Sequence, residues 1–237
     1  MDQVAEFTDE RQKAWCVHCG RRLTGVEHSR DHVPSKSLLL KPYPDNLPVV
    51  PVCRSCNTGF APDEEYLLAF LGSVLAGSTD PEKQVHGNAA RVLTRNPSLR
   101  ARIESARSEL QTSSGEKRII WKPEVERIDR VLLKNARGHA IFEIGEPMLE
   151  PPAYVRSAPL EALTVEQRAG FEGIDFGPGW PEVGSRMTSR MLTRQDLANG
   201  WVVVQEGLYR YAVMQTSAIL VKAVLFGYLA TEILWEP

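Results

Sequence analysis

The apolar residues in the first half of the chain recur mainly at helical spacing. A helix is predicted over 62–76, because six apolar residues fall on one helical face there and Gly77 suits the C-terminal cap. A second helix is expected from about residue 81, and a third from the break at Asn96 to about Leu110. The apolar face of the first helix consists of Tyr66, Leu67, Phe70, Leu71, Val74 and Leu75.

After a predicted loop at 112–115, the pattern changes. Residues 118–121 favour a short strand, and residues 123–137 predict a helix with one apolar side. The other side of that helix is basic and is a candidate for contact with a DNA backbone; it carries Arg127, Arg130, Lys134 and Arg137.

The last part of the chain is strand-like. Residues 145–185 are rich in Pro and Gly and are expected to be irregular. Residues 201–205 and 208–214 flank a Glu-Gly turn, and residues 219–226 and 229–235 flank Gly227, which predicts two β-hairpins.

These elements predict an α+β protein with a mainly antiparallel β domain at its C-terminus. We expect three regions: a module at 1–80, a helical connector at 81–114 and an α+β domain at 115–237, whose role would be recognition, dimerisation or regulation.

Composition narrows the class of protein. Of the 237 residues, 43% are hydrophobic and 24% are charged, as in a globular chain with a real core. The net charge is −2, which disfavours a tight non-specific nucleic-acid binder, so any phosphate contact needs a local basic patch or a metal.

The longest apolar stretch, 218–230, contains Lys222 and is too short to span a bilayer, and no signal peptide is evident. We expect a cytoplasmic protein without membrane contact.

All four cysteines of the chain fall in two Cys-x-x-Cys knuckles. Such a knuckle presents two thiolates on one tight turn, and two knuckles supply the four ligands of a tetrahedral zinc site. A site closed by four sulfurs leaves no position for water, so the expected Zn²⁺ is structural. Its ligands would be Cys16, Cys19, Cys53 and Cys56.

A second group of chemically capable residues lies between and beside the knuckles. Asp31 offers a carboxylate and Asn57 an amide oxygen, which are ligands that Mg²⁺ or Mn²⁺ accepts. His32 has a side chain that can take a proton from water near neutral pH. Because Asn57 follows Cys56 directly, the zinc knuckle would fix its position.

Local geometry sets two conditions on this site. Neighbours on a regular strand point to opposite faces, so Asp31 and His32 can serve one site only if the strand ends or twists there. Pro34, two residues later, favours such an end. Gly59 and Pro62 argue against an unbroken helix after Asn57, which predicts a catalytic helix of one turn.

The stretch Asp31-His32, then Asn46, then Cys53-Arg54-Ser55-Cys56-Asn57 resembles the HNH nucleases, in which a zinc ribbon wraps a ββα-metal motif. The resemblance covers about the first quarter of the chain. It implies that His32 activates water, that Asp31 and Asn57 hold the metal, and that Asn46 braces the loop.

The resemblance also implies a metal-dependent endonuclease that cuts DNA, with RNA not excluded, and leaves a 5′-phosphate and a 3′-hydroxyl. One such site cuts one strand, so a double-strand break would require a homodimer or two events. Restriction, phage defence and mobile-element biology all fit. Basic residues beside the motif are candidate phosphate contacts, namely Arg30, Lys36 and Arg54. The alternative is a non-catalytic zinc-ribbon module that binds nucleic acid or protein.

Overall fold

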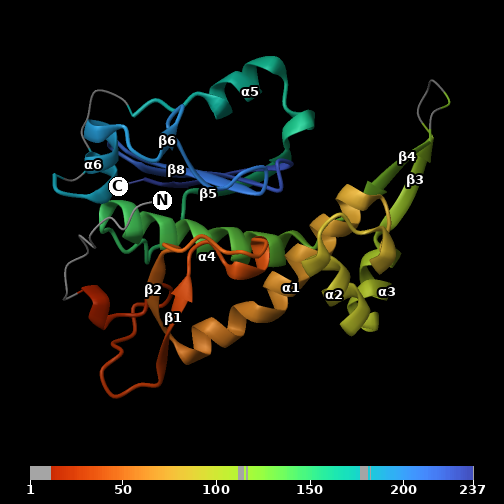
Figure 1. Ribbon diagram of the computed structural model, residues 1–237, viewed down its shortest axis with the longest axis horizontal. Coiled ribbons are helices and arrows are strands. Elements are labelled where there is room, and N and C mark those ends of the chain that lie inside the picture. Colours follow the sequence, from red (N-terminus) through yellow and green to blue (C-terminus); the bar gives the residue numbers. More distant parts are fainter. Residues whose placement is uncertain (1–11, 112–114, 116, 177–180, 182, 237) are drawn as a thin grey trace. The chain divides into compact units, whose positions relative to one another are not determined.

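The computed structural model describes residues 12–111, 115, 117–176, 181 and 183–236. Helices and strands are mixed along the chain, and the C-terminal part forms a six-stranded antiparallel sheet (Figure 1). The predicted mixture of helix and antiparallel sheet is therefore confirmed. Most of the loop predicted at 112–115 lies outside the described residues. Within the described ranges, no helix has both the length and the apolar character needed to cross a membrane.

The element bounds are as follows. The α-helices are α1 (Arg54–Ala76), α2 (Gly87–Arg95), α3 (Pro97–Ser105), α4 (Val125–Ile144), α5 (Val165–Glu172) and α6 (Arg186–Thr193). The strands are β1 (His28–His32), β2 (Val49–Cys53), β3 (Arg107–Gln111), β4 (Lys117–Trp121), β5 (Tyr154–Pro159), β6 (Leu197–Ala198), β7 (Trp201–Gln205), β8 (Tyr209–Gln215), β9 (Ile219–Leu225) and β10 (Leu229–Trp235).

The chain packs as two compact units. The first combines residues 1–59 with residues 132–237, and the second is the continuous segment 60–131. These units cut across the boundaries expected at residues 80 and 114, and that three-region division stays a prediction.

The first unit begins with a hairpin and a helix. β1 and β2 pair antiparallel, from His28 opposite Cys53 to His32 opposite Val49, and α1 starts at the residue after β2. Two strands followed directly by a helix place Cys53 and Cys56 on either side of the strand-to-helix junction.

The one-turn helix predicted after Asn57 is wrong, because α1 runs unbroken from Arg54 to Ala76 with Pro62 inside it. An internal proline costs about 3 kcal/mol, since one backbone hydrogen bond is lost and the ring crowds the preceding turn. The buried side chains further along, including Tyr66 and Leu67, offset this cost. The helix ends as expected: Gly77 has a φ of 62°, and Ser78 N–H donates to the Ser73 carbonyl, as in a Schellman cap.

In the second unit, the third predicted helix ends early. α3 stops at Ser105, and residues 107–111 form β3, which pairs with β4 from Arg107 opposite Trp121 to Gln111 opposite Lys117. The strand predicted at 118–121 is thus confirmed, while the helix expected to reach Leu110 is wrong at its end. Residues 107–111 form a strand because β4 pairs with them, and the periodicity of the local sequence does not reveal that partner.

The six-stranded sheet of the first unit has the order β5-β10-β9-β8-β7-β6. Both predicted hairpins, β7–β8 and β9–β10, are confirmed, with Gly207 and Gly227 at positive φ in their turns. The region 145–185 is not wholly irregular, because it contains β5 and α5. One face of the sheet carries a cluster that includes Trp201, Phe171 and Ala212.

The part of α4 in the first unit packs on the opposite face of the sheet (Figure 1). Its His139 ring stacks on Tyr211 with centroids 3.7 Å apart, and Nε2 lies 3.0 Å from the Tyr209 hydroxyl. Glu143 is fully buried and accepts hydrogen bonds from Tyr211 at 2.5 Å and from Arg190 at 3.0 Å. Partners on two other elements, Tyr211 of β8 and Arg190 of α6, make this buried charge tolerable.

Helix α4 continues past Arg137, where it was expected to end, and Gly138 explains why a glycine stands in its interior. A Cβ atom built on Gly138 would lie 2.5 Å from Cγ2 of Val33, the residue directly after β1. Helix and hairpin can approach this closely only without a side chain at position 138. The buried residues Ala140 and Ile144 then continue the apolar face.

We expect Gly138→Ala to lower the free energy of unfolding by about 1–3 kcal/mol, since an overpacked methyl must displace Val33 or the helix. The matched control is Gly170→Ala in α5, where an added Cβ meets nothing within 4 Å. That change should stabilise the protein by roughly 0.5 kcal/mol. Urea unfolding of both variants measures the difference, and equal stabilities would contradict the close approach.

The first unit also contains a hydrogen-bonded link between distant segments. The side-chain amide of Gln205 in β7 accepts from the Leu40 backbone N–H at 2.8 Å and donates to the Leu40 carbonyl at 3.0 Å. The amide of Gln205 therefore satisfies both backbone groups of one residue, as a neighbouring strand would.

Candidate metal centre and the hairpin beside it

The four cysteines come together at the base of the β1–β2 hairpin. Their Sγ atoms all lie within 4.8 Å of one another, and those of Cys19 and Cys53 are 3.8 Å apart. Two sulfurs in a disulfide lie about 2.0 Å apart. Four sulfurs bound to one zinc at about 2.3 Å lie about 3.8 Å from each other in a tetrahedron. The four thiols could therefore hold one metal ion such as zinc.

The proton affinities of the thiols suit a cation. Burial raises the pKa of Cys53, but hydrogen bonds from the Ser55 hydroxyl and the Cys56 backbone outweigh burial and lower the pKa to about 6. The pKa of Cys56 is raised, because burial and the neighbouring sulfurs oppose further negative charge. Four thiolates this close require a positive ion among them.

The first knuckle is tied to the body of the first unit by α4. The Arg137 guanidinium donates to the His18 carbonyl at 3.0 Å and to the Leu149 carbonyl at 3.1 Å. Inside the knuckle, Gly20 has a φ of 67° and its N–H donates to the Cys16 carbonyl at 2.9 Å. Backbone geometry and a helix side chain together hold Cys16 and Cys19 in place.

Asp31 lies in a buried polar cluster against α4. Its Oδ2 atom is 2.8 Å from Lys134 Nζ and 3.9 Å from His18 Nε2. Lys134 is only 4% exposed and also donates to Ser35 Oγ at 2.8 Å. Burial by itself raises the pKa of Asp31, but His18 and Lys134 outweigh it, so the pKa lies below its ordinary value. Asp31 is therefore an anion held by a buried cation.

We expect Lys134→Met to lower the free energy of unfolding by about 3 kcal/mol, because the carboxylate of Asp31 loses its buried partner. The matched control is Arg54→Met, which removes an exposed ion pair with Glu27 and should cost less than about 1 kcal/mol. Denaturant unfolding compares the two. A loss for Lys134→Met no larger than that of the control would show that the pair contributes nothing.

The strand β1 includes both Asp31 and His32 in regular pairing and ends directly after His32, so the strand does not end between them. By register, Asp31 shares a face of the hairpin with Ser29 and Val50, whereas His32 shares the other face with Arg30. Partial burial, followed by the positive charge of Lys36, lowers the pKa of His32 below its ordinary value. The imidazole is therefore neutral at pH 7 and able to accept a proton.

Asn57 lies in the first turn of α1, and its Nδ2 donates to Ser29 Oγ at 2.8 Å. Since Ser29 and Asp31 share one face of β1, Asn57 is directed to the face that carries Asp31. Asn46 lies in the turn before β2, where Leu47 N–H donates to the Pro44 carbonyl at 3.2 Å. The contacts thus connect Asn57 to the strand of the Asp-His pair.

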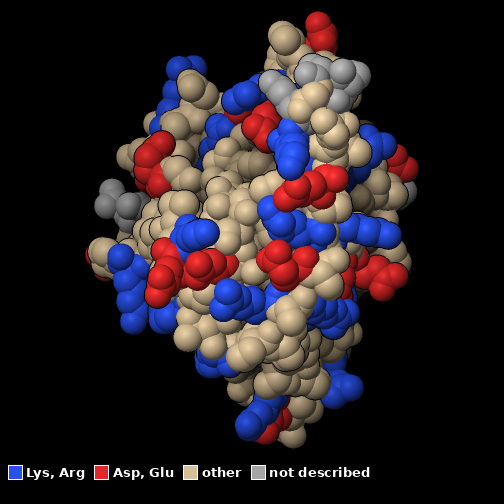
Figure 2. All heavy atoms as spheres, turned by 90° about the vertical axis from the view of Figure 1, so that its right-hand side faces the viewer, with Lys and Arg blue, Asp and Glu red and all other residues tan. Residues whose placement is uncertain are grey.

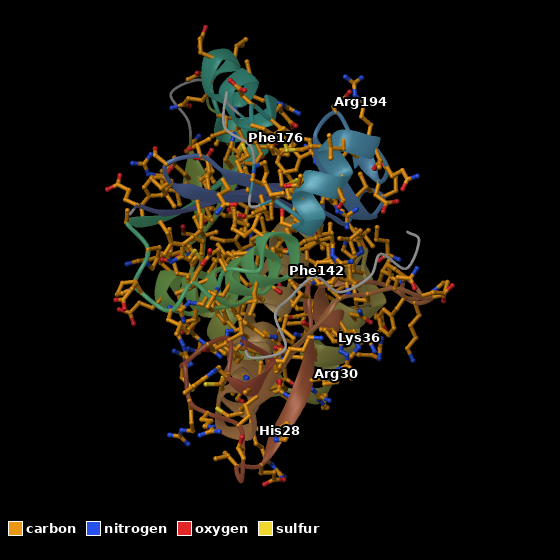
Figure 3. All side chains as sticks on the ribbon, turned by 90° about the vertical axis from the view of Figure 1, so that its left-hand side faces the viewer. His28, Arg30, Lys36, Phe142, Phe176 and Arg194 are labelled. Atoms are coloured by element: carbon orange, nitrogen blue, oxygen red, sulfur yellow. The ribbon has the colours of Figure 1, made fainter. Side chains whose placement is uncertain are left out.

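A groove of about 320 Å³ runs beside the hairpin. Its polar lining includes Lys13, His28 and Arg30, and its apolar lining includes Pro51 and Phe142. Figure 3 shows His28, Arg30 and Lys36 following one another along β1 and the segment after it. Of the three residues named as phosphate contacts, Arg30 lines the groove, Lys36 lies 5.3 Å from the Tyr43 ring, and Arg54 pairs with Glu27.

The basic face predicted for the helix after residue 123 is used mainly inside the protein. In the second unit, Arg127 and Arg130 each lie 2.6 Å from a carboxylate oxygen of Asp63. In the first unit, Lys134 is buried and Arg137 bonds to backbone carbonyls. Lys134 and Arg137 are therefore engaged within the protein, whereas the Arg130 side chain is 56% exposed. Contact of this helix with a DNA backbone stays a prediction.

Sequence analysis missed the cluster around Asp31. His18 is only 7% exposed, and nothing in the sequence indicated that His18, Lys134 or Ser35 lies near residue 31. Lys134 belongs to the side of the helix that was predicted to be basic, so the local pattern carried no signal that it is buried.

Comparison of the chain with models of protein families, with curated proteins and with solved structures finds no match. The chemistry of the site must therefore be argued from its residues.

Proposed function

We propose that the protein is a metal-dependent endonuclease of the HNH type that hydrolyses phosphodiester bonds in DNA. One observation carries the proposal: a β-hairpin runs directly into a helix, with four clustered thiols at the junction, the Asp31-His32 pair on the hairpin and Asn57 on the helix. The four-cysteine cluster would hold a structural Zn²⁺ that fixes the helix start, and with it Asn57.

Asp31 and Asn57 would hold a divalent ion, Mg²⁺ or Mn²⁺, which when bound supplies positive charge against the phosphorane-like transition state. Asp31 would hold the ion while its carboxylate also stays 2.8 Å from Lys134 Nζ. Lys134 also keeps Asp31 ionised, because it lowers the pKa of that carboxyl.

His32 would take a proton from water while the water oxygen attacks phosphorus. The phosphorus–O3′ bond breaks, and the products are a 5′-phosphate and a 3′-hydroxyl. The neutral state of His32 at pH 7 suits this role. Asn46 would brace the loop before β2, and Arg30, Lys36 and Arg54 would approach the phosphates beside the groove.

The test is nicking of supercoiled plasmid by purified protein with Mg²⁺ or Mn²⁺, with a chelator arm and a His32→Ala arm. We expect open-circular product from wild type alone. A protein with normal zinc content that remains silent over both metals, and over single-stranded, double-stranded and RNA substrates, would contradict the proposal.

A second candidate is a zinc-ribbon module that binds nucleic acid or protein without cleaving it. The observation that favours it is the ion pair of Asp31 with buried Lys134, which already neutralises the carboxylate. Mn²⁺ binding would separate the two functions: tight binding that is lost in Asp31→Asn supports the nuclease, and its absence supports the binding module.

A further inference from the structure

Residues 87–122, from the start of α2 to the residue after β4, carry a positive net charge, whereas the chain as a whole carries a negative one. Between residues 87 and 122 there are eight Lys or Arg residues and three Glu residues, a surplus of five positive charges in a chain of net charge −2. The segment lies within the second unit, which contains none of the residues of the proposed cleavage site. Two of these arginines pair with glutamates outside the segment, Arg95 with Glu65 and Arg102 with Glu124. The positive charges that remain favour a polyanionic partner.

Two short helices form the first half of this segment. α2 and α3 are separated by Asn96 alone, whose side chain caps α3 by accepting from the Leu99 N–H at 3.1 Å. Leu99 and Ile103 are the buried face of α3. The opposite face is exposed and carries Ser98, Ala101, Glu104 and Ser105. Arg102 lies at its border and pairs with Glu124 at 2.6 Å.

A two-stranded ribbon forms the second half. β3 and β4 pair only with each other among the described strands, and both faces of the ribbon are open to solvent. Leu110 is 52% exposed and Ile120 is 44% exposed. Lys117 and Arg118 stand on the same strand, one on each face of the ribbon. An isolated ribbon with exposed apolar side chains is marginal in water and suits an element that is covered on binding.

We propose that α3 and the β3–β4 ribbon form a surface that binds duplex DNA. The exposed face of α3 would enter the major groove, and Lys117 and Arg118 of the ribbon would contact phosphates next to it. Figure 2 faces the side on which Figure 1 labels α3, β3 and β4, and shows groups of Lys and Arg side chains with acidic side chains between them. Positive and negative side chains are therefore mixed on this side of the molecule.

Dimensions favour B-form DNA over duplex RNA. The major groove of B-DNA is about 12 Å wide and admits a helix or a two-stranded ribbon, whereas that of A-form RNA is too deep and narrow for either. The small residues Ser98 and Ala101 leave the α3 backbone free to approach base edges closely. The proposal goes beyond the cleavage site, because it concerns how the protein holds a duplex and not how it cuts one.

The test measures binding without cleavage. The full chain with His32→Ala is titrated against a fluorescent DNA duplex of about 25 base pairs over a range of salt concentrations, with the same duplex as RNA for competition. Lys117→Ala/Arg118→Ala is compared with Arg156→Ala/Arg168→Ala, which removes two exposed positive charges from the first unit. Thermal melts confirm that both double variants fold.

We expect the ribbon variant to bind DNA roughly tenfold more weakly and to reduce the slope of log Kobs against log salt by about 2. The matched double variant should leave both unchanged, and duplex RNA should compete poorly. Glu109→Gln removes a negative charge from the ribbon and should tighten binding a few-fold, a gain that misfolding cannot produce.

Equal losses in the two double variants, or equal competition by DNA and RNA duplexes, would overturn the proposal. So would the absence of DNA binding by the His32→Ala chain at low salt. A chain that binds DNA through the ribbon but never nicks plasmid would retain this inference while the nuclease proposal fails, so the two are judged separately.

Discussion

Cys53→Ser is expected to abolish stoichiometric zinc binding and to lower the free energy of unfolding by about 5 kcal/mol, or the melting temperature by roughly 10–20 °C. Cys53 is fully buried, and its Sγ is 3.8 Å from that of Cys19. Serine in its place offers a poor ligand, so the three remaining thiols would have an incomplete tetrahedron. Metal analysis and thermal melting of the purified variant measure the two effects.

Chelation supplies the control for this substitution. Wild-type protein treated with a zinc chelator should melt like Cys53→Ser, and added Zn²⁺ should restore wild type but leave the variant unchanged. The four clustered thiols are all the cysteines of the chain, so no other thiol can replace the missing ligand. A zinc-free wild type that melts at the unchanged temperature would show that the cluster carries no structural metal.

His32→Ala is expected to slow plasmid nicking by about 10²–10⁴-fold, the range of a general base. The loss should appear in kcat more than in KM, because the imidazole acts on water and not on the bound duplex. Gel quantitation of open-circular product over time, at saturating Mg²⁺, gives both constants.

His28→Ala is the matched control, since His28 lies on the same strand and the same face, four residues earlier. It lines the groove and should change KM by less than about tenfold while kcat stays near wild type. Partial recovery of His32→Ala by free imidazole would support proton transfer. Equal kcat losses in the two variants would show that His32 has no special role.

Elements with a strong local pattern could be predicted from the sequence. The helix through Tyr66 and Phe70, its end at Gly77, and the two C-terminal hairpins follow from periodicity and turn residues, and all are confirmed. The clustering of the four thiols also follows from spacing, because two knuckles flank one short hairpin.

Elements that depend on a distant partner could not be predicted. Strand β5 exists because it pairs with β10, and β3 exists because it pairs with β4. Helix α4 runs past its predicted end at Arg137 and through Gly138, a glycine that Val33 approaches closely. The ion pair between Asp31 and Lys134 joins residues that nothing in the local sequence connects, so the environment of the candidate site was the least predictable part.

The link between Gln205 and Leu40 has a consequence for the order of events during synthesis. The two residues are 165 positions apart, so a ribosome needs roughly ten to thirty seconds to deliver the partner of Leu40. Both knuckles are complete once Cys56 has been made, 16 residues after Leu40, so for most of that interval all four thiols exist while the backbone of Leu40 is still hydrated. A metal held by these thiols could therefore bind the nascent hairpin before the C-terminal sheet is made.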